Sequence, residues 1–180
     1  MKEKIKKALM VLLFGGFCMT GAFAKTVVVY FSCTGNTERL AKTAAKALDA
    51  DLIQIIPEKA YTAQDLDWND RASRSTKECN DPSSRPAIQN RIDVSAYDCV
   101  IIAYPIWWAY APKIIYTFVE SVDLTEKKVV PICTSGGSGL GSSGTALAKA
   151  SGNGDWRKGS AFRSTASESE LKKFFEQALK

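Results

Sequence analysis

Residues 30–38 read Tyr30-Phe31-Ser32-Cys33-Thr34-Gly35-Asn36-Thr37-Glu38. They follow a β-branched apolar run that begins at Thr26, and they lead into a helical pattern that extends to Leu48. A buried strand is therefore expected to end in a hydroxyl-rich turn that opens a helix. The free N–H groups and the positive dipole end of a helix N-terminus attract anions, and a glycine lets the backbone approach the anion closely. The stretch predicts a phosphate-binding turn.

Strand and helix patterns alternate along the rest of the chain. Strands are expected at residues 26–32, 51–56, 98–104, 128–133 and within 155–162, and helices at 36–48, within 63–77, and at 112–122, 139–150 and 167–180. The last helix carries a capping-box pattern, with Ser167 at the N-cap and Glu170 three residues on. This alternation predicts an α/β fold, a doubly wound three-layer sandwich with a five-stranded parallel sheet. Ligands bind such sheets outside the carboxyl ends of the strands.

Residues 1–24 are predicted to be a signal peptide. Four lysines precede an apolar stretch at residues 8–17, and Ala22-Phe23-Ala24 has the pattern of a cleavage site. The apolar stretch is short for a membrane span. We therefore expect residues 25–180 to form one domain that is exported to a bacterial periplasm, or that stays membrane-anchored where the signal is not cleaved.

Charge and histidine content exclude several classes of function. The chain has 180 residues and a formal net charge of +5, which falls to +2 without the four Lys and one Glu of residues 1–24. So small a charge does not favour nucleic-acid binding. The chain contains no histidine, which excludes His-based triads and His-containing zinc sites. A cofactor is therefore expected to supply any chemistry.

Four cysteines lie outside the predicted signal peptide: Cys33, Cys79, Cys99 and Cys133. Export permits disulfides. However, Cys33, Cys99 and Cys133 lie in or at the ends of predicted strands, and neighbouring strand positions rarely have the geometry of a disulfide. We expect these three to be free thiols. Cys79 lies in a polar segment, and the sequence leaves open whether it forms a disulfide.

Two further loops follow predicted strands at the same edge of the sheet. The earlier one reads Tyr104-Pro105-Ile106-Trp107-Trp108-Ala109-Tyr110, and the later one reads Cys133-Thr134-Ser135-Gly136-Gly137-Ser138-Gly139. Large aromatic side chains on a loop can form a wall for a flat ring, and small residues let backbone N–H groups reach the edge of a ligand. Each loop alone could instead cover the core or cap a helix. Together the three loops predict a site for a ligand with a phosphate and a flat ring.

In order and spacing, residues 26–180 resemble the flavodoxin family, and within it a bacterial branch with a Tyr-Pro-Ile-Trp-Trp loop. The resemblance implies a flavodoxin-like protein that binds flavin mononucleotide (FMN) and acts in electron transfer or as a small flavin oxidoreductase. It implies cofactor-binding residues in all three loops: Ser32, Cys33, Thr34, Gly35, Asn36 and Thr37 near the phosphate, Tyr104, Pro105, Ile106, Trp107 and Trp108 near the ring, and Thr134, Ser135, Gly136 and Gly137 near the pyrimidine edge. The redox partner is left open, with NAD(P)H and a quinone-like substrate as candidates.

Two departures from the standard flavodoxin pattern bear on the expected role. The loop after residue 133 lacks the aromatic residue that usually stacks on the outer face of the flavin. The Trp-Trp loop lacks the glycine whose peptide flips when the flavin is reduced. These departures argue against a pure one-electron carrier and favour hydride exchange with a substrate or a nicotinamide.

Two other functions compete with the flavin interpretation. Cys33 and Arg39 have the Cys-x5-Arg spacing of phosphotyrosine phosphatases, in which a thiolate at a helix N-terminus is the nucleophile, and Asp81 is followed by a proline as a candidate general acid. No Ser or Thr follows Arg39, and this alternative leaves the other two loops unexplained. The second alternative is an exported binding module that has lost its cofactor.

Overall fold

The computed structural model describes residues 25–180, so the predicted signal peptide lies outside the described residues. The strands are β1 (Thr26–Tyr30), β2 (Asp51–Gln54), β3 (Cys99–Pro105), β4 (Lys128–Thr134), β5 (Asp155–Trp156) and β6 (Ser160–Phe162). The helices are α1 (Asn36–Leu48), α2 (Arg74–Asn80), α3 (Lys113–Ser121), α4 (Ser143–Ser151) and α5 (Glu168–Ala178). Among the described residues, no helix is both long and apolar enough to cross a membrane.

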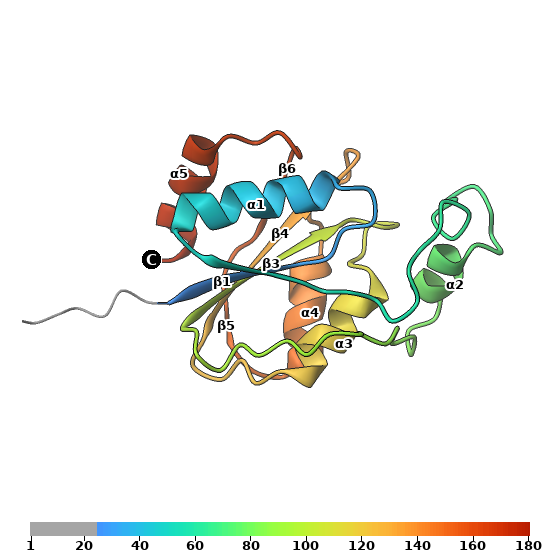
Figure 1. Ribbon diagram of the computed structural model, residues 1–180, viewed down its shortest axis with the longest axis horizontal. Helices are drawn as coiled ribbons and strands as arrows, with labels where there is room; N and C mark the ends of the chain where they lie inside the picture. Colours follow the sequence, from blue (N-terminus) through green and yellow to red (C-terminus); the bar gives the residue numbers. More distant parts are fainter. Residues whose placement is uncertain (1–24) are drawn as a thin grey trace, which may run out of the picture.

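The strands form one parallel sheet in the order β2-β1-β3-β4, with β5 and β6 both paired to the outer side of β4. The chain order reverses direction between β1 and β3, as in doubly wound sheets. Helices α1 and α5 cover one face of the sheet, and α3 and α4 cover the other (Figure 1). The expected three-layer α/β fold is confirmed.

Alternation along the central strands explains why both faces are covered. Ile101 of β3 belongs to the same buried cluster as Leu40 of α1 and Phe175 of α5, whereas its neighbour Ile102 belongs to the cluster that contains Phe118 of α3. Successive side chains of a strand point to opposite faces, and a strand buried on both faces reads as a continuous apolar run. The core therefore lies in two layers, one on each side of the sheet.

The last strand differs from the expectation, because it consists of two short pieces. Trp156 pairs with Val129, whereas Ser160 pairs with Ile132, so the outer strand carries one extra residue between these pairs. Pro131 lies opposite this bulge and has no N–H to donate to an outer strand. A Cβ on Gly159 would overlap the Pro131 carbonyl oxygen and lie 2.7 Å from Pro131 Cγ. The bulge therefore accommodates a proline in a central strand.

Helix α4 begins at Ser143 rather than at residue 139 as predicted. The residues before it contain Gly139 and Gly141, which have φ angles of 71° and 53°. These left-handed conformations are incompatible with a right-handed helix. The glycine-rich loop is therefore longer, and the helix shorter, than expected.

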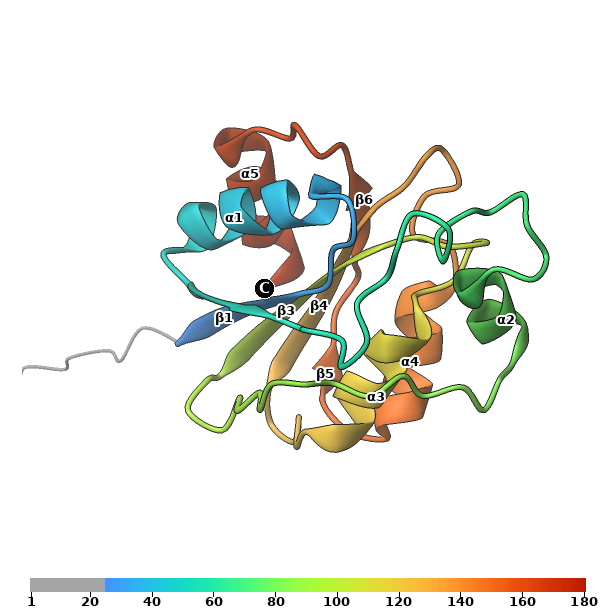
Figure 2. The ribbon, with the colours of Figure 1, turned by 45° about the vertical axis from the view of Figure 1, so that its right-hand side comes forward.

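Helix α2 occupies only the end of the predicted range and extends past it: it spans Arg74–Asn80, and residues 63–72 contain turns instead. Aspartate side chains in this segment accept backbone N–H bonds: Asp67 from Asn69 at 2.9 Å and Asp70 from Ala72 at 2.8 Å. Such local bonds compete with the helical ladder. Ser73 then caps the helix by accepting from the N–H of Thr76. Helix α2 lies apart from both helical layers, beyond the carboxyl end of β3 (Figure 1, Figure 2).

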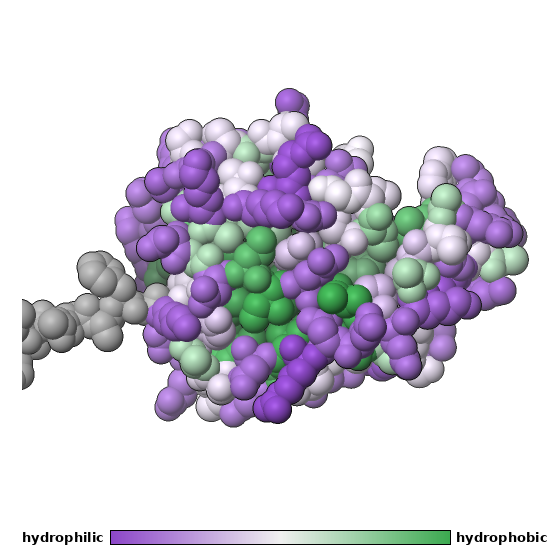
Figure 3. All heavy atoms as spheres, in the orientation of Figure 1, coloured by the Kyte–Doolittle hydropathy of each residue, from purple (hydrophilic) through white to green (hydrophobic). Residues whose placement is uncertain are grey.

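Strand β2 is the free edge of the sheet, and the chain closes its carboxyl end. The Gln89 N–H donates to the Ile56 carbonyl at 2.7 Å, and the Asn90 amide bridges the Ile56 N–H and the Gln54 carbonyl at 2.9 and 2.8 Å. Covering an edge in this way protects it from pairing with other chains. Figure 3 shows an apolar area below α1 on this side of the molecule, bordered by charged and polar residues.

Candidate functional site

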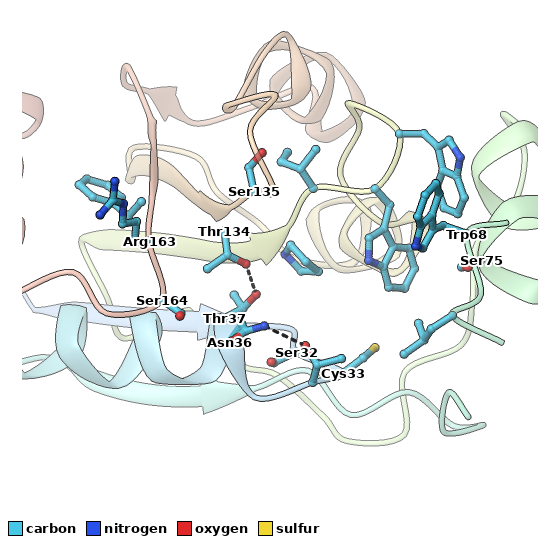
Figure 4. A pocket seen from close by; sticks show the side chains of 18 residues that line it. Ser32, Cys33, Asn36, Thr37, Trp68, Ser75, Thr134, Ser135, Arg163 and Ser164 are labelled. Carbon is cyan, nitrogen blue, oxygen red and sulfur yellow. Dashed lines mark hydrogen bonds between the residues drawn. The ribbon is translucent and has the colours of Figure 1, made fainter. Parts of the chain in front are cut away.

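A cavity of 690 Å³ lies at the carboxyl edge of the sheet (Figure 4). Most of its wall comes from the loops that follow β1, β3 and β4, and the rest comes from the β2–β3 connection and the end of β6. Twelve of the residues predicted from the sequence line it: Ser32, Cys33, Thr34, Asn36, Thr37, Pro105, Ile106, Trp107, Trp108, Thr134, Ser135 and Gly136. The structure therefore brings the three predicted loops together around one space.

Three predicted residues do not line the cavity. Tyr104 is fully buried in the core on the α3 and α4 side of the sheet. Its hydroxyl shares a 2.9 Å hydrogen bond with the Ser143 hydroxyl, and burial raises the pKa of Tyr104 above its ordinary value. Strand alternation turns this side chain into the core, so the structure makes it a core residue rather than a wall of the site. Gly35 and Gly137 lie within the loops but outside the lining.

The turn after β1 presents free backbone donors. Gly35 is the N-cap residue of α1, with φ 81° and no side-chain cap bond, and the first helical bond runs from the Arg39 N–H to the Gly35 carbonyl at 3.0 Å. The N–H groups of the residues in between have no acceptor within the helix. The hydroxyl of Thr37, which is 1% exposed, shares a 2.7 Å hydrogen bond with the Thr134 hydroxyl. This bond ties the first loop to the third, beside donors suited to an anion.

Cys33 and Arg39 do not form a phosphatase site in this arrangement. Burial is the largest cause that raises the pKa of Cys33, which reaches about 12. The thiol therefore stays protonated at neutral pH, whereas a catalytic cysteine needs a lowered pKa. Because α1 already begins at Asn36, Arg39 lies on the first helical turn, exposed and outside the cavity lining. The cavity thus offers no activated thiolate, and Arg39, the arginine of the Cys-x5-Arg pattern, does not line it.

The Trp-Trp loop is a tight turn that projects one tryptophan to the surface. Trp107 and Tyr110 exchange backbone hydrogen bonds of 2.9 and 2.8 Å, and between them Trp108 and Ala109 have φ angles of 47° and 66°. Positive φ at both central positions is the geometry of a type I′ turn. Trp108 is 40% exposed. The turn holds an aromatic wall at one end of the cavity.

Aromatic contacts fix the orientation of Trp107. Its ring meets Phe31 at a centroid distance of 5.9 Å and Tyr61 at 5.5 Å, both edge to face. Arg74 lies over the Tyr61 ring at 3.9 Å and pairs with Glu78 at 2.6 Å, and the Tyr61 hydroxyl donates to the same carboxylate at 2.5 Å. These contacts attach the long connection between β2 and β3 to the Trp-Trp loop.

The hydroxyl of Ser135 stabilises the third loop through hydrogen bonds within the loop. Ser135 Oγ accepts hydrogen bonds from the N–H groups of Gly137 and Gly139, each at 3.1 Å. Gly137 and Gly139 have φ angles of 147° and 71°, a region that favours glycine. The loop therefore keeps a defined shape and presents small residues to the cavity.

Six lining residues were not predicted: Leu66, Trp68, Ser75, Phe162, Arg163 and Ser164. Trp68 and Ser75 lie at one end of the cavity, and Arg163 and Ser164 lie on the side of Thr37 and Thr134 (Figure 4). Phe162 ends β6 and is followed by Arg163 and Ser164, so the rule that placed the other loops at this edge of the sheet also applies to these three residues. For Trp68, the feature that could have indicated a place in the site is an isolated tryptophan in a polar segment.

The cysteines and acidic residues add no metal site or disulfide. All four cysteines among residues 25–180 are free thiols, which answers the open question about Cys79. The Cys79 thiol donates to the Trp107 carbonyl at 3.7 Å. In this part of the chain, no group of three or more His, Cys, Asp or Glu residues could hold a metal ion.

Comparisons with known proteins agree with the architecture. A family model described as flavodoxin matches residues 25–178. A crystal structure from Bacteroides eggerthii, assigned as a flavoprotein, is 42% identical with a TM-score of 0.84 and covers 88% of this chain and 99% of its own. A similar Bacteroides uniformis protein is 43% identical with a TM-score of 0.80, over 85% and 98% of the two chains. No curated protein matches.

A more distant structure shares the fold alone. A Lactobacillus acidophilus flavoprotein, crystallised in complex with FMN, is 20% identical with a TM-score of 0.65, over 88% of this chain and all of its own.

Proposed function

Because this chain belongs to the flavodoxin family, we propose that it binds FMN in the cavity at the carboxyl edge of the sheet and works as a redox protein. The observation that carries this proposal is the convergence of three separate loops on one space, with the 2.7 Å bond between Thr37 and Thr134 joining two of them. Bound flavin supplies the redox chemistry by accepting and returning electrons, and the protein orients it and tunes it.

The donor set of the cavity suits the two ends of FMN. At one end, the first N–H groups of α1 and the hydroxyls of Thr34 and Thr37 would hold the phosphate. At the other end, Trp107 and Trp108 would line the ring. The core position of Tyr104 removes it from this set.

We favour a flavin oxidoreductase over a pure electron carrier. The third loop carries no aromatic side chain over the cavity, and Trp68 and Trp108, which line its ring end, are 73% and 40% exposed. An accessible ring suits direct exchange with a small reductant. We expect anaerobic stopped-flow mixing with NADPH to bleach the flavin in a single turnover. Reduction by a one-electron donor alone, with NADPH and NADH inert, would assign the carrier role instead.

Substitutions in the first loop separate flavin binding from phosphatase chemistry. Thr34→Asp places a negative charge beside the proposed phosphate and should raise the FMN dissociation constant by about tenfold or more, while a charge at the helix N-terminus leaves the apoprotein stable. Cys33→Ser should leave FMN binding largely intact, because serine keeps a small polar side chain at this lining position. Turnover of p-nitrophenyl phosphate by the wild-type protein that is lost in Cys33→Ser would support the phosphatase.

We also propose that the protein is exported after cleavage behind Ala24. The support is the sequence pattern of residues 1–24: a basic start, a short apolar stretch and an A-x-A site. Intact-mass measurement of protein from the periplasmic fraction of a bacterial host should give a chain that starts at Lys25. Full-length protein in the cytoplasmic fraction would contradict this proposal.

A further inference from the structure

Ser75 has a buried hydroxyl that forms no hydrogen bond with the other described residues. The residue is 1% exposed and lines the cavity, and its Oγ has no hydrogen-bond partner among the described residues. Its backbone is engaged, because the Ser75 N–H donates to the Asp65 carbonyl at 2.9 Å. A buried hydroxyl without a partner destabilises a folded protein. The hydroxyl is therefore the group in this wall that a bound ligand would satisfy.

The surroundings of Ser75 hold it in place. Its neighbour Arg74 pairs with Glu78 at 2.6 Å and donates to the Lys59 carbonyl at 2.7 Å. On its other side, Thr76 donates its N–H to the capping hydroxyl of Ser73. The residues on both sides of Ser75 are thus fixed by contacts. The Ser75 side chain can still rotate between staggered χ1 positions.

Ser75 lies at the aromatic end of the cavity, beside Trp68 and away from Thr37 and Thr134 (Figure 4). We infer that the Ser75 hydroxyl hydrogen-bonds a polar edge atom of the flavin ring, an inference that rests on the proposed binding of FMN. Ser75 is then a cofactor-binding residue contributed by the connection between β2 and β3.

The test compares FMN with riboflavin, which has the same ring and no phosphate. Ser75→Ala should raise the dissociation constants of both ligands by a similar factor, about threefold to tenfold, as expected for one lost hydrogen bond. Ser75→Thr, which keeps the hydroxyl, should restore binding. The melting temperature of the Ser75→Ala apoprotein should match or exceed the wild type, because the removed group has no partner there.

Ser73→Ala serves as the matched control in the same helix turn. It removes a hydroxyl that caps α2 and lies outside the cavity lining, so it should lower the melting temperature of the apoprotein. Unchanged binding of both ligands to Ser75→Ala would overturn the inference, as would weaker binding of FMN alone, since that would place the hydroxyl at the phosphate. Failure of the wild-type protein to bind either ligand would instead contradict the proposed function.

Discussion

At the scale of single residues, Arg163 sets the charge of the proposed site. It is the one charged residue among the described residues that line the cavity, and it lies on the side of Thr37 and Thr134 (Figure 4). A guanidinium near a phosphate attracts it through charge and hydrogen bonds. Because Arg163 is exposed, solvent and salt screen this attraction.

We expect Arg163→Gln to weaken FMN binding by about threefold to fivefold at low ionic strength, the range of an exposed ion pair. The effect should shrink as salt is added, and riboflavin binding should not change. Fluorescence titration of the apoprotein with each ligand measures both. Arg39→Gln is the control, since Arg39 is close in sequence to the phosphate turn but outside the cavity. Equal effects from the two variants would show that only net charge matters.

At the scale of elements, the junction between β4 and the outer strand depends on a close contact. Gly159 lies against Pro131, and Gly144 of α4 meets the same proline, with a built Cβ only 2.9 Å from Pro131 Cγ. Glycines on both sides thus let the chain pack around a proline in a central strand. The bulge between β5 and β6 is the structural result.

Gly159→Ala should destabilise the protein by about 3 kcal/mol, because the added methyl group has no space and the backbone must move. Gly136→Ala is the control: no atom lies within 4 Å of a Cβ built there, and its φ is not in the left-handed region. Urea unfolding of the apoproteins measures both. A Gly159→Ala variant as stable as Gly136→Ala would rule out the described contact.

Local patterns were sufficient to predict most elements, but they missed the divided outer strand and the turns that precede α2. The central strands and α1, α3 and α5 were predicted because apolar spacing and caps are local signals; Ser167, for example, does accept the Glu170 N–H at 3.2 Å. The divided outer strand was not predicted, since it results from the contact of Gly159 with Pro131. The turns before α2 follow from aspartate side chains that accept backbone N–H bonds and so compete with a helix.

The site, too, could be predicted only in part from the sequence. Loops that directly follow strands were predicted to meet, and twelve of their residues do line one cavity. Ser75 and Trp68 reach the cavity through a long connection whose position depends on the contacts of Tyr61, Arg74 and Glu78. No local pattern in the sequence encodes those contacts.

At the scale of the whole molecule, buried thiols should make the fold sensitive to alkali. Burial raises the pKa of Cys33 and Cys133 to about 12 and that of Cys99 to about 11, from an ordinary value of 9.0. Between pH 9.0 and these values the unfolded chain loses thiol protons that the folded chain retains. The folded state then binds more protons than the unfolded state, so stability falls as pH rises.

The contribution of these thiols to the free energy of unfolding should therefore not change with pH up to about pH 8, and the free energy should decline steadily above about pH 9. Urea unfolding across this range measures the slope. Replacing Cys99 and Cys133 with alanine lowers overall stability by leaving small cavities, but it should flatten the alkaline slope. A slope that is unchanged in this double variant would contradict the assignment to thiols.

The proposed function requires that one FMN binds per chain in the cavity formed by the three loops. The most direct measurement is a fluorescence titration of FMN with flavin-free protein comprising residues 25–180. We predict that flavin emission is quenched by the neighbouring tryptophans and that the signal saturates at one FMN per chain. FMN emission that shows no saturable change at any protein concentration would rule out FMN binding in this cavity.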